Sequence, residues 1–110
     1  MAGPRTIRRE WMLNLVMDEV RLRCRYRRRG KKLLDYTVQL ELFHRDEWRA
    51  VFRYDNAHGF SHYDVIHPDG TQDKVAVYRG DANENFTWAI KELRASWQLQ
   101  KDRYLAEAEP

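Results

Sequence analysis

The residues best suited to chemistry lie within one stretch of twelve positions, 53–64. This stretch combines two histidines, two aspartates, an arginine and a glycine. Packing alone rarely requires that mixture, whereas proton transfer, metal binding and phosphate recognition all use it. The candidate catalytic residues are therefore Arg53, Asp55, His58, His62 and Asp64.

The spacing of these residues predicts how a site would be built. Turn-forming residues between positions 55 and 59 indicate a strand, a turn and a second strand. Side chains two apart on a strand point to the same face, which places His62 beside Asp64. A carboxylate can orient and charge an imidazole for acid or base work, and Arg53 would supply a fixed positive charge for a phosphate.

Two other interpretations of this stretch are open. In the first, Asp55 and Asn56 cap the turn and the histidines bind backbone carbonyls, so that the stretch serves structure only. The second is a zinc or manganese site, which we favour less because His-x-x-x-His places both rings on one face only in a helix. We therefore expect no metal and no cofactor. The ligands of such a metal site would be His58, His62, Asp64 and, as a fourth, His67.

A second candidate surface is strongly basic. Residues 1–32 contain eleven Lys or Arg against three acids, whereas residues 33–110 contain nine against fourteen. A basic end attracts nucleic acid, and it attracts an acidic protein equally well. The alternative is a solvated or salt-bridged outer face that discourages aggregation through strand edges. The predicted nucleic-acid-binding residues are Arg21, Arg23, Arg25, Arg27, Arg28, Arg29, Lys31 and Lys32.

The elements that must position these residues indicate an α+β domain. Period-two alternation predicts strands separated by turns, and a long amphipathic helix follows, with Asp81 as its N-cap and Glu84 three residues on. We expect one domain over 1–110, an antiparallel meander of about five strands packed against one long C-terminal helix. Residues 1–10 are expected to be a mobile basic leader, and 11–17 fit either a strand or a helix. The predicted strands are 20–27, 33–43, 48–54, 60–67 and 71–79.

The alternation also assigns residues to faces. The even-numbered residues from Tyr36 to Leu42 are predicted to face the core. The odd-numbered residues between 35 and 41 should then lie across from the arginine row and partly neutralise it. The even-numbered residues from Trp48 to Tyr54 are expected to share one side of the third strand.

Composition limits the class of protein. With 110 residues, 43% of them apolar and 34% charged, the chain predicts a single globular domain. The longest mostly apolar stretch, 11–17, is far shorter than the roughly 20 residues needed to cross a bilayer. The first residues do not resemble a secretory signal, and the single cysteine, Cys24, cannot form an internal disulfide. We therefore expect a cytoplasmic protein that makes no membrane contact, with Cys24 buried.

The stretch Arg53-Tyr54-Asp55-Asn56-Ala57-His58-Gly59 with His62 resembles a segment of small uncharacterised prokaryotic proteins. More distantly, it is similar to the TumE-type toxins of bacterial and archaeal toxin–antitoxin pairs. Those toxins carry an Arg-aromatic-Asp-Asn-Ala stretch followed by His, and then a helix near the end of the chain. The resemblance implies a toxin that acts on RNA and is held inactive by a DNA-binding antitoxin. Its site residues would be Arg53, Asp55, Asn56, His58 and His62.

The leading functional prediction is an RNA-interacting, toxin-like protein acting as a metal-independent endoribonuclease. One histidine, His62 or His58, would take the proton of a 2′-hydroxyl, and the other histidine or Asp64 would assist. Arg53 would stabilise the transition state that leads to a cyclic phosphate. The alternative is a non-catalytic module whose basic hairpin binds nucleic acid or an acidic protein. Partners are therefore RNA or another nucleic acid, an antitoxin or acidic protein, and a second copy in a homodimer.

Overall fold

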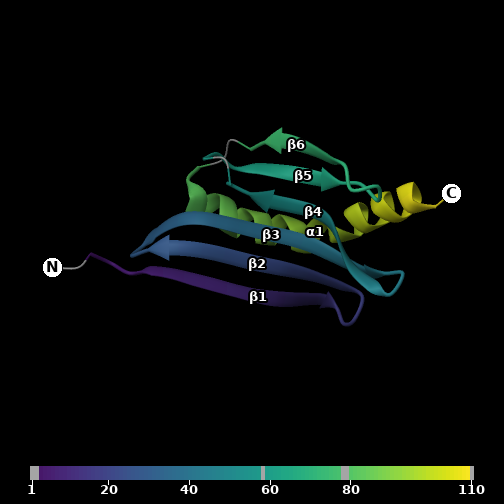
Figure 1. Ribbon diagram of the computed structural model, residues 1–110, viewed down its shortest axis with the longest axis horizontal. Helices are drawn as coiled ribbons and strands as arrows, with labels where there is room; N and C mark the ends of the chain where they lie inside the picture. Colours follow the sequence, from purple (N-terminus) through teal and green to yellow (C-terminus); the bar gives the residue numbers. More distant parts are fainter. Residues whose placement is uncertain (1–2, 58, 78–79, 110) are drawn as a thin grey trace.

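The computed structural model describes residues 3–57, 59–77 and 80–109. Within these ranges the chain forms six strands and one long helix (Figure 1). The predicted α+β domain, an antiparallel meander with one C-terminal helix, is confirmed, with six strands in place of five. The elements are β1 (Thr6–Val16), β2 (Val20–Arg29), β3 (Lys32–His44), β4 (Glu47–Asp55), β5 (His62–Ile66), β6 (Gln72–Ala76) and α1 (Ala82–Ala108).

Each strand pairs antiparallel with its neighbours in chain order, from β1 to β6. The turn between β3 and β4 places Arg45 and Asp46 at φ values of 53° and 64°. Two consecutive residues with positive φ are typical of the type I′ turn, whose twist matches that of the strands it joins. Gly30 and Gly70 take positive φ in the turns after β2 and β5, where a side chain would be strained.

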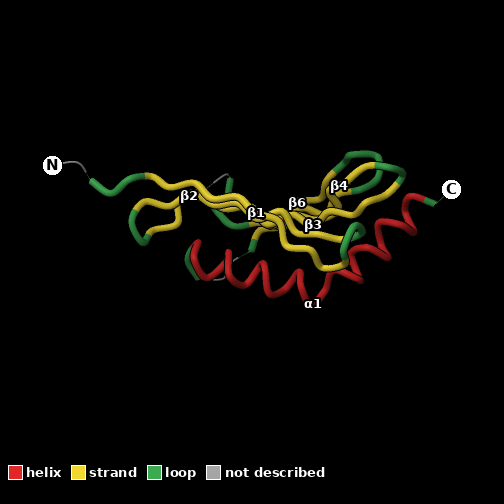
Figure 2. The backbone as a smooth tube through the Cα atoms, turned by 90° about the horizontal axis from the view of Figure 1, so that it is seen from below, coloured by secondary structure: helices red, strands yellow, loops and turns green. Residues whose placement is uncertain are grey.

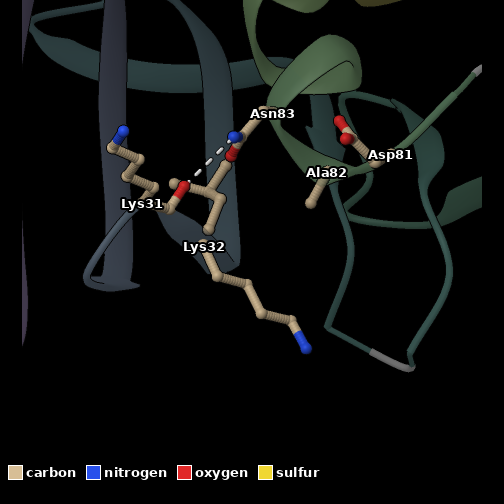
Figure 3. Close-up of a pocket in the computed structure, with 6 residues that line it drawn as sticks. Lys31, Lys32, Asp81, Ala82 and Asn83 are labelled. Carbon is tan, nitrogen blue, oxygen red and sulfur yellow. Dashed lines mark hydrogen bonds between the residues drawn. The ribbon is translucent and has the colours of Figure 1, made fainter. Parts of the chain in front are cut away.

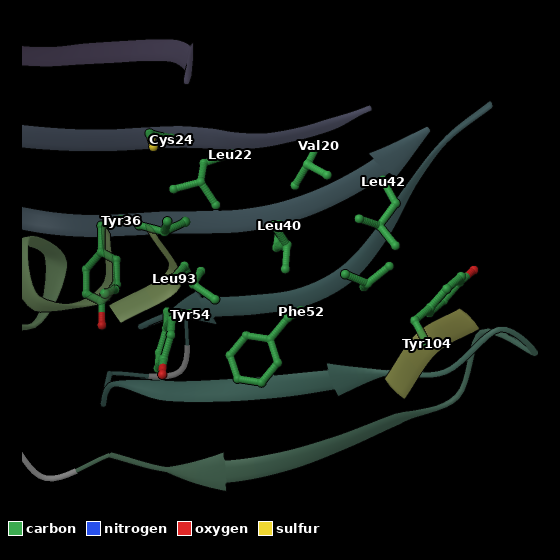
Figure 4. Packing of buried hydrophobic residues seen from close by; sticks show 13 residues of the cluster. Val20, Leu22, Cys24, Tyr36, Leu40, Leu42, Phe52, Tyr54, Leu93 and Tyr104 are labelled. Carbon is green, nitrogen blue, oxygen red and sulfur yellow. The ribbon is translucent and has the colours of Figure 1, made fainter. Parts of the chain in front are cut away.

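The helix α1 covers one face of the sheet (Figure 2). The core lies between them, where apolar side chains of β2, β3 and β4 meet α1 (Figure 4). Leu22, Leu40 and Leu93 have no exposed surface. Each such leucine contributes about 1.5 to 3 kcal/mol relative to an exposed one. The prediction that Tyr36, Leu42 and the even-numbered residues between them face the core is confirmed.

The start of α1 matches its predicted cap. The Asp81 side chain accepts a hydrogen bond from the Glu84 amide at 2.9 Å, and Glu84 adds an acidic charge to the first turn. The ring of Phe86 packs edge-on against Trp11 and Tyr26, with centroids 5.9 and 5.7 Å apart. This contact fixes the first turns of the helix against β1 and β2. Over the residues described, no helix combines the length and apolar character needed to cross a membrane.

The sheet face opposite α1 is polar, and we call it the polar face. The strand register aligns side chains from successive strands into rows that run across this face. The arginines at positions 21, 23, 25 and 27 therefore share one surface with Arg53, Asp55, His62 and Asp64, two groups that the sequence alone had not placed together. The two principal rows are Arg23, Gln39, Arg53, Asp64, Lys74 and Arg25, Thr37, Asp55, His62.

The predicted mobile leader over residues 1–10 is wrong from Thr6 onward. Residues 6–16 form β1, which pairs with β2 from Thr6 opposite Arg29 to Val16 opposite Val20. The reason is that β2 would otherwise present an unpaired edge, and β1 satisfies its backbone hydrogen bonds. The open question for residues 11–17 is also answered, because positions 11 to 16 belong to this strand.

The predicted common side for Trp48, Ala50, Phe52 and Tyr54 is also wrong. A bulge between Ala50 and Phe52 leaves Val51 without a partner on β3. The extra residue reverses the alternation, so Phe52 and Tyr54 face the core while Trp48 and Ala50 lie on the polar face. There, the guanidinium carbon of Arg21 lies 3.9 Å from the centre of the Trp48 ring.

Candidate functional site

Two neighbouring strand ends bring Asp55 and His62 together. Asp55 ends β4, His62 begins β5, and the register places them directly opposite each other on the polar face. The Nε2 atom of His62 lies 2.8 Å from Oδ1 of Asp55. The predicted strand, turn and strand over this stretch thus places a carboxylate against an imidazole. The closest carboxylate is that of Asp55, whereas the spacing had predicted that of Asp64.

The next register pair, Arg53 and Asp64, adjoins the first. The Asp64 Oδ2 atom lies 3.6 Å from His62 Nε2 and 3.6 Å from the Nη1 atom of Arg53. Arg53 also donates from Nε to the side-chain oxygen Oε1 of Gln39 at 2.9 Å, which holds its side chain along the row. Four of the predicted catalytic residues therefore form one cluster. We call Arg53, Asp55, His62, Asp64 and the adjacent Lys74 the polar cluster.

Lys74 is the member of the polar cluster that sequence reasoning missed. Its Nζ atom lies 3.3 Å from His62 Nε2 and 3.9 Å from Asp64 Oδ1. The signal was present in the sequence, because the turn at residues 68–70 sets the register of β5 against β6. Counting outward equally from Asp69 pairs Asp64 with Lys74, as observed.

Burial limits what the polar cluster can do. The side chains of His62 and Asp64 are 1% and 2% exposed, whereas those of Arg53 and Lys74 are 25% and 44% exposed. An anion approaching the polar face would therefore first meet the two cations. Proton transfer between His62 and an external substrate would require the covering side chains to move.

The other predicted site residues lie elsewhere. His58 lies outside the described residues. The Asn56 side chain accepts from the Tyr36 amide at 2.9 Å and donates to the Leu34 carbonyl at 3.3 Å, so it extends the pairing of β4 with β3. His67 lies away from the polar cluster, between Asp73 and Glu107.

Four arginines of β2 are paired with acids, as the predicted faces require: Arg21, Arg23, Arg25 and Arg27. Glu41 is 5% exposed and accepts from Arg21 at 2.7 Å and from Arg23 at 3.0 Å. Burial alone would raise the pKa of Glu41, but the hydrogen bonds from Arg21, Gln39 and Arg23 outweigh it and lower the pKa. Asp35 similarly lies 3.3 Å from Arg25 and 2.6 Å from Arg27. The strand arginines are thus largely neutralised within the sheet.

A second group of bases lies at the end of the sheet that holds the β2–β3 turn and the start of β1 (Figure 1). Across the part of the chain that the structure describes, these bases make no ion pair with an acid. Lys31 and Lys32 also border a pocket of about 400 Å³ at the start of α1, where the Asn83 amide donates to the Lys31 carbonyl at 3.3 Å (Figure 3). We call the group the basic end: Arg5, Arg9, Arg28, Arg29, Lys31 and Lys32.

Comparison with known protein families matches residues 6–110 to a family described as "Domain of unknown function (DUF7718)". The chain belongs to this family. None of the curated proteins and none of the solved structures matches it. The DUF7718 description carries no activity, so the resemblance to TumE-type toxins stays a prediction, and function must be argued from the polar cluster and the basic end.

Proposed function

We propose that this DUF7718 protein binds the phosphate backbone of nucleic acid, with RNA as the expected ligand, through the basic end. One observation supports the proposal. Positive charge is concentrated at the basic end without acidic partners among the described residues, whereas the β2 arginines at positions 21, 23, 25 and 27 are held by Glu10, Asp35 and Glu41. Lysines and arginines that form no ion pair with an acid can neutralise phosphates without first breaking such a pair.

The strand arginines have a secondary role in this proposal. To bind phosphate, Arg21 or Arg23 would have to share or leave the carboxylate of Glu41, which is nearly buried. Losing one partner of such a pair leaves a buried charge without compensation, which costs free energy. Arg27 is more exposed, at 48% of its side chain, and continues the basic end toward the polar face. The predicted contribution of Arg21, Arg23, Arg25 and Arg27 to nucleic-acid binding stays a prediction.

The test is a binding titration with a fluorescently labelled single-stranded RNA at several salt concentrations. The Lys31→Gln/Lys32→Gln variant should bind more weakly, and the slope of log affinity against log salt should become shallower by about 1.4, or about 0.7 for each lost phosphate contact. The matched control is Arg45→Gln/Arg94→Gln, which removes two exposed charges away from the basic end. An equal loss in both variants would show only a general charge effect and would overturn the proposal. Binding to an acidic protein but not to RNA would do the same.

Endoribonuclease activity is a second candidate, and the contact between Asp55 and His62 is the observation that favours it. A carboxylate at 2.8 Å would orient the imidazole and stabilise its charged form during proton transfer. The side chain of His62 is 1% exposed, so Lys74 or Arg53 would have to move before a 2′-hydroxyl could reach it.

Expression in bacteria under a tight promoter tests this activity. Growth and total RNA integrity would be scored together for the wild type and for a His58→Ala/His62→Ala variant. Growth arrest with RNA degradation in the wild type, abolished in the variant, is the expected result for a nuclease. Intact RNA in both strains would exclude nuclease activity. Salt-dependent binding of RNA by the purified protein would then support binding as its function.

A further inference from the structure

The geometry points to a divalent-cation site in the polar cluster, formed by Asp55, His62 and Asp64. Each side chain can offer one ligand atom, and these three atoms all lie within 4.8 Å of one another. The three side chains are 10%, 1% and 2% exposed, so the atoms are held by the surrounding sheet. The site shares no residue with the basic end, and the inference is independent of the proposed binding of nucleic acid.

Two charged groups contact one ring nitrogen of His62. His62 Nε2 lies 2.8 Å from Asp55 Oδ1 and 3.3 Å from Lys74 Nζ. That nitrogen carries either a hydrogen or a lone pair. The carboxylate needs the hydrogen and the ammonium needs the lone pair, so neither tautomer satisfies both contacts. A cation bound by the lone pair and by the Asp55 oxygen would resolve this conflict.

One carboxylate oxygen of the cluster, Oδ1 of Asp64, is buried and has no hydrogen-bond partner among the described residues. The Lys74 ammonium lies 3.9 Å from this oxygen, which is too long for a hydrogen bond. A buried carboxylate oxygen without a partner is costly, and a bound cation is one of the few groups that would satisfy it.

The surroundings of the three side chains suit ligation. A cation on His62 Nε2 requires the imidazole proton on Nδ1, where the Phe60 carbonyl, 3.4 Å away, can accept it. Asp55 Oδ1 accepts from the Ala57 amide at 3.1 Å. The Nη1 atom of Arg53 lies 3.6 Å from Oδ2 of Asp64, the oxygen that is also 3.6 Å from His62 Nε2. Each ligand is therefore oriented by a second contact, as in metal sites generally.

The ligand set suggests which cation would bind. One imidazole and two carboxylates suit zinc or manganese, and three protein ligands leave positions for water. Ligand atoms about 2.0 to 2.2 Å from a tetrahedral zinc lie roughly 3.4 Å apart. The observed 2.8 and 3.6 Å separations from His62 Nε2 bracket that distance. The third separation, between the Asp55 and Asp64 ligand oxygens, is within 4.8 Å, so the two carboxylates would move toward the metal on binding.

Lys74 is a built-in competitor for this position. Its ammonium group lies beside two of the three ligands, His62 and Asp64, and its side chain is 44% exposed on the edge strand β6. It can therefore turn toward solvent when a metal binds. Metal affinity should consequently rise when the lysine is removed, an effect that a purely structural hydrogen-bonded cluster would not show.

The experiment is a titration of the purified protein with ZnCl₂ and with MnCl₂. Binding is measured by calorimetry and by the shift in melting temperature. Asp64→Asn should weaken binding at least tenfold, because even residues that only hydrogen-bond to a metal ligand contribute about that factor. Lys74→Gln should strengthen binding by about tenfold, because a positive charge about 4 Å away is removed. The control is His67→Gln, which removes the other histidine contacted by two acids, and it should leave the affinity unchanged.

Three outcomes would overturn the inference. One is that neither the wild type nor Lys74→Gln binds either metal. The second is that Asp64→Asn binds as tightly as the wild type, and the third is that His67→Gln abolishes binding. Because Lys74 is partly exposed on an edge strand, Lys74→Gln should fold normally, so the test does not depend on the stability of the Asp64→Asn variant.

Discussion

Glu41 accepts a hydrogen bond from Arg21 Nε at 2.7 Å across the β2–β3 pair, while the same carboxylate binds Arg23 at 3.0 Å. The glutamate side chain is 6% exposed, and the arginine side chains are 18% and 38% exposed. One buried acid thus holds two arginines in place. The central part of the polar face is therefore an ordered ion-pair network.

The first prediction follows from this network. Glu41→Gln should lower the free energy of unfolding by about 1 to 3 kcal/mol, because two charge-assisted hydrogen bonds lose their charged acceptor. The measurement is urea unfolding at neutral pH. Glu47→Gln is the matched control, since Glu47 lies 3.2 Å from Arg49 but is 70% exposed, and its effect should stay within about 0.5 kcal/mol. Equal losses in the two variants would contradict a special role for Glu41.

The pH dependence of this effect has a defined sign. The pKa of Glu41 is lowered in the folded state, so its stabilising contribution is present above the ordinary glutamate pKa. That contribution is lost as the pH falls through the lowered value. The difference in stability between the wild type and Glu41→Gln should therefore shrink in acid, and a difference that does not change with pH would contradict the ion-pair explanation.

The second prediction concerns His67, which links β5 to the end of α1. Its Nδ1 atom lies 2.9 Å from Glu107 and its Nε2 atom 2.7 Å from Asp73, and these hydrogen bonds, that of Glu107 first, raise its pKa. The stabilisation is complete below the ordinary histidine pKa of about 6.5 and is lost as the pH rises through the raised value. Unfolding at pH 5.5, 7 and 8.5 should show this decline in the wild type. The decline should be smaller in His67→Gln.

The sequence predicted the parts of the fold that depend on local periodicity. The alternation from Val20 to Arg27 and from Leu33 to Phe43 identified the central hairpin, and Asp81 with Glu84 marked the start of the helix. It also brought His62 and Asp64 to one face. These features follow from a period of two or from a local cap, and neither depends on distant residues.

The features that the sequence did not predict depend on tertiary contacts. The bulge at Val51 follows no local pattern, and its carbonyl accepts a hydrogen bond from Arg103 Nη2 of α1, 52 residues away, at 2.8 Å. The first half of β1 was missed because residues 6–10 are mostly polar and charged and show no apolar alternation. Pairing with β2 is what makes them a strand. The contact of Asp55 with His62 required the exact register across the 56–61 turn, which the residues of the turn do not specify.

The third prediction concerns the single thiol. Cys24 has no exposed surface, and burial raises its pKa to about 12. The thiolate is the reactive form, so iodoacetamide at pH 8 should not modify the native protein. Unfolding the protein in guanidinium should allow complete labelling, and mass spectrometry measures both states. Rapid labelling of the native protein would show that β2 opens readily.

The fourth prediction separates structure from function at Asn56. The resemblance to TumE-type toxins implies a site role for this residue, whereas its side chain here pairs with the Tyr36 amide and the Leu34 carbonyl of β3. Asn56→Ala should therefore lower the free energy of unfolding by about 1 to 2 kcal/mol, because two backbone groups lose their partner. The measurement is denaturant unfolding, together with RNA binding at a temperature where the variant remains folded.

A matched asparagine provides the control for this prediction. Asn83 also donates to a backbone carbonyl, that of Lys31 at 3.3 Å, but it is exposed at the start of α1, so Asn83→Ala should cost less than about 0.5 kcal/mol. If Asn56→Ala kept full stability but lost RNA binding or cleavage, Asn56 would be a functional residue. If Asn56→Ala lost stability while the folded variant still bound RNA as the wild type does, the role of Asn56 would be structural. Its side-chain amide would then extend the β3–β4 ladder, because it pairs with the backbone of β3 just beyond the last residue of β4.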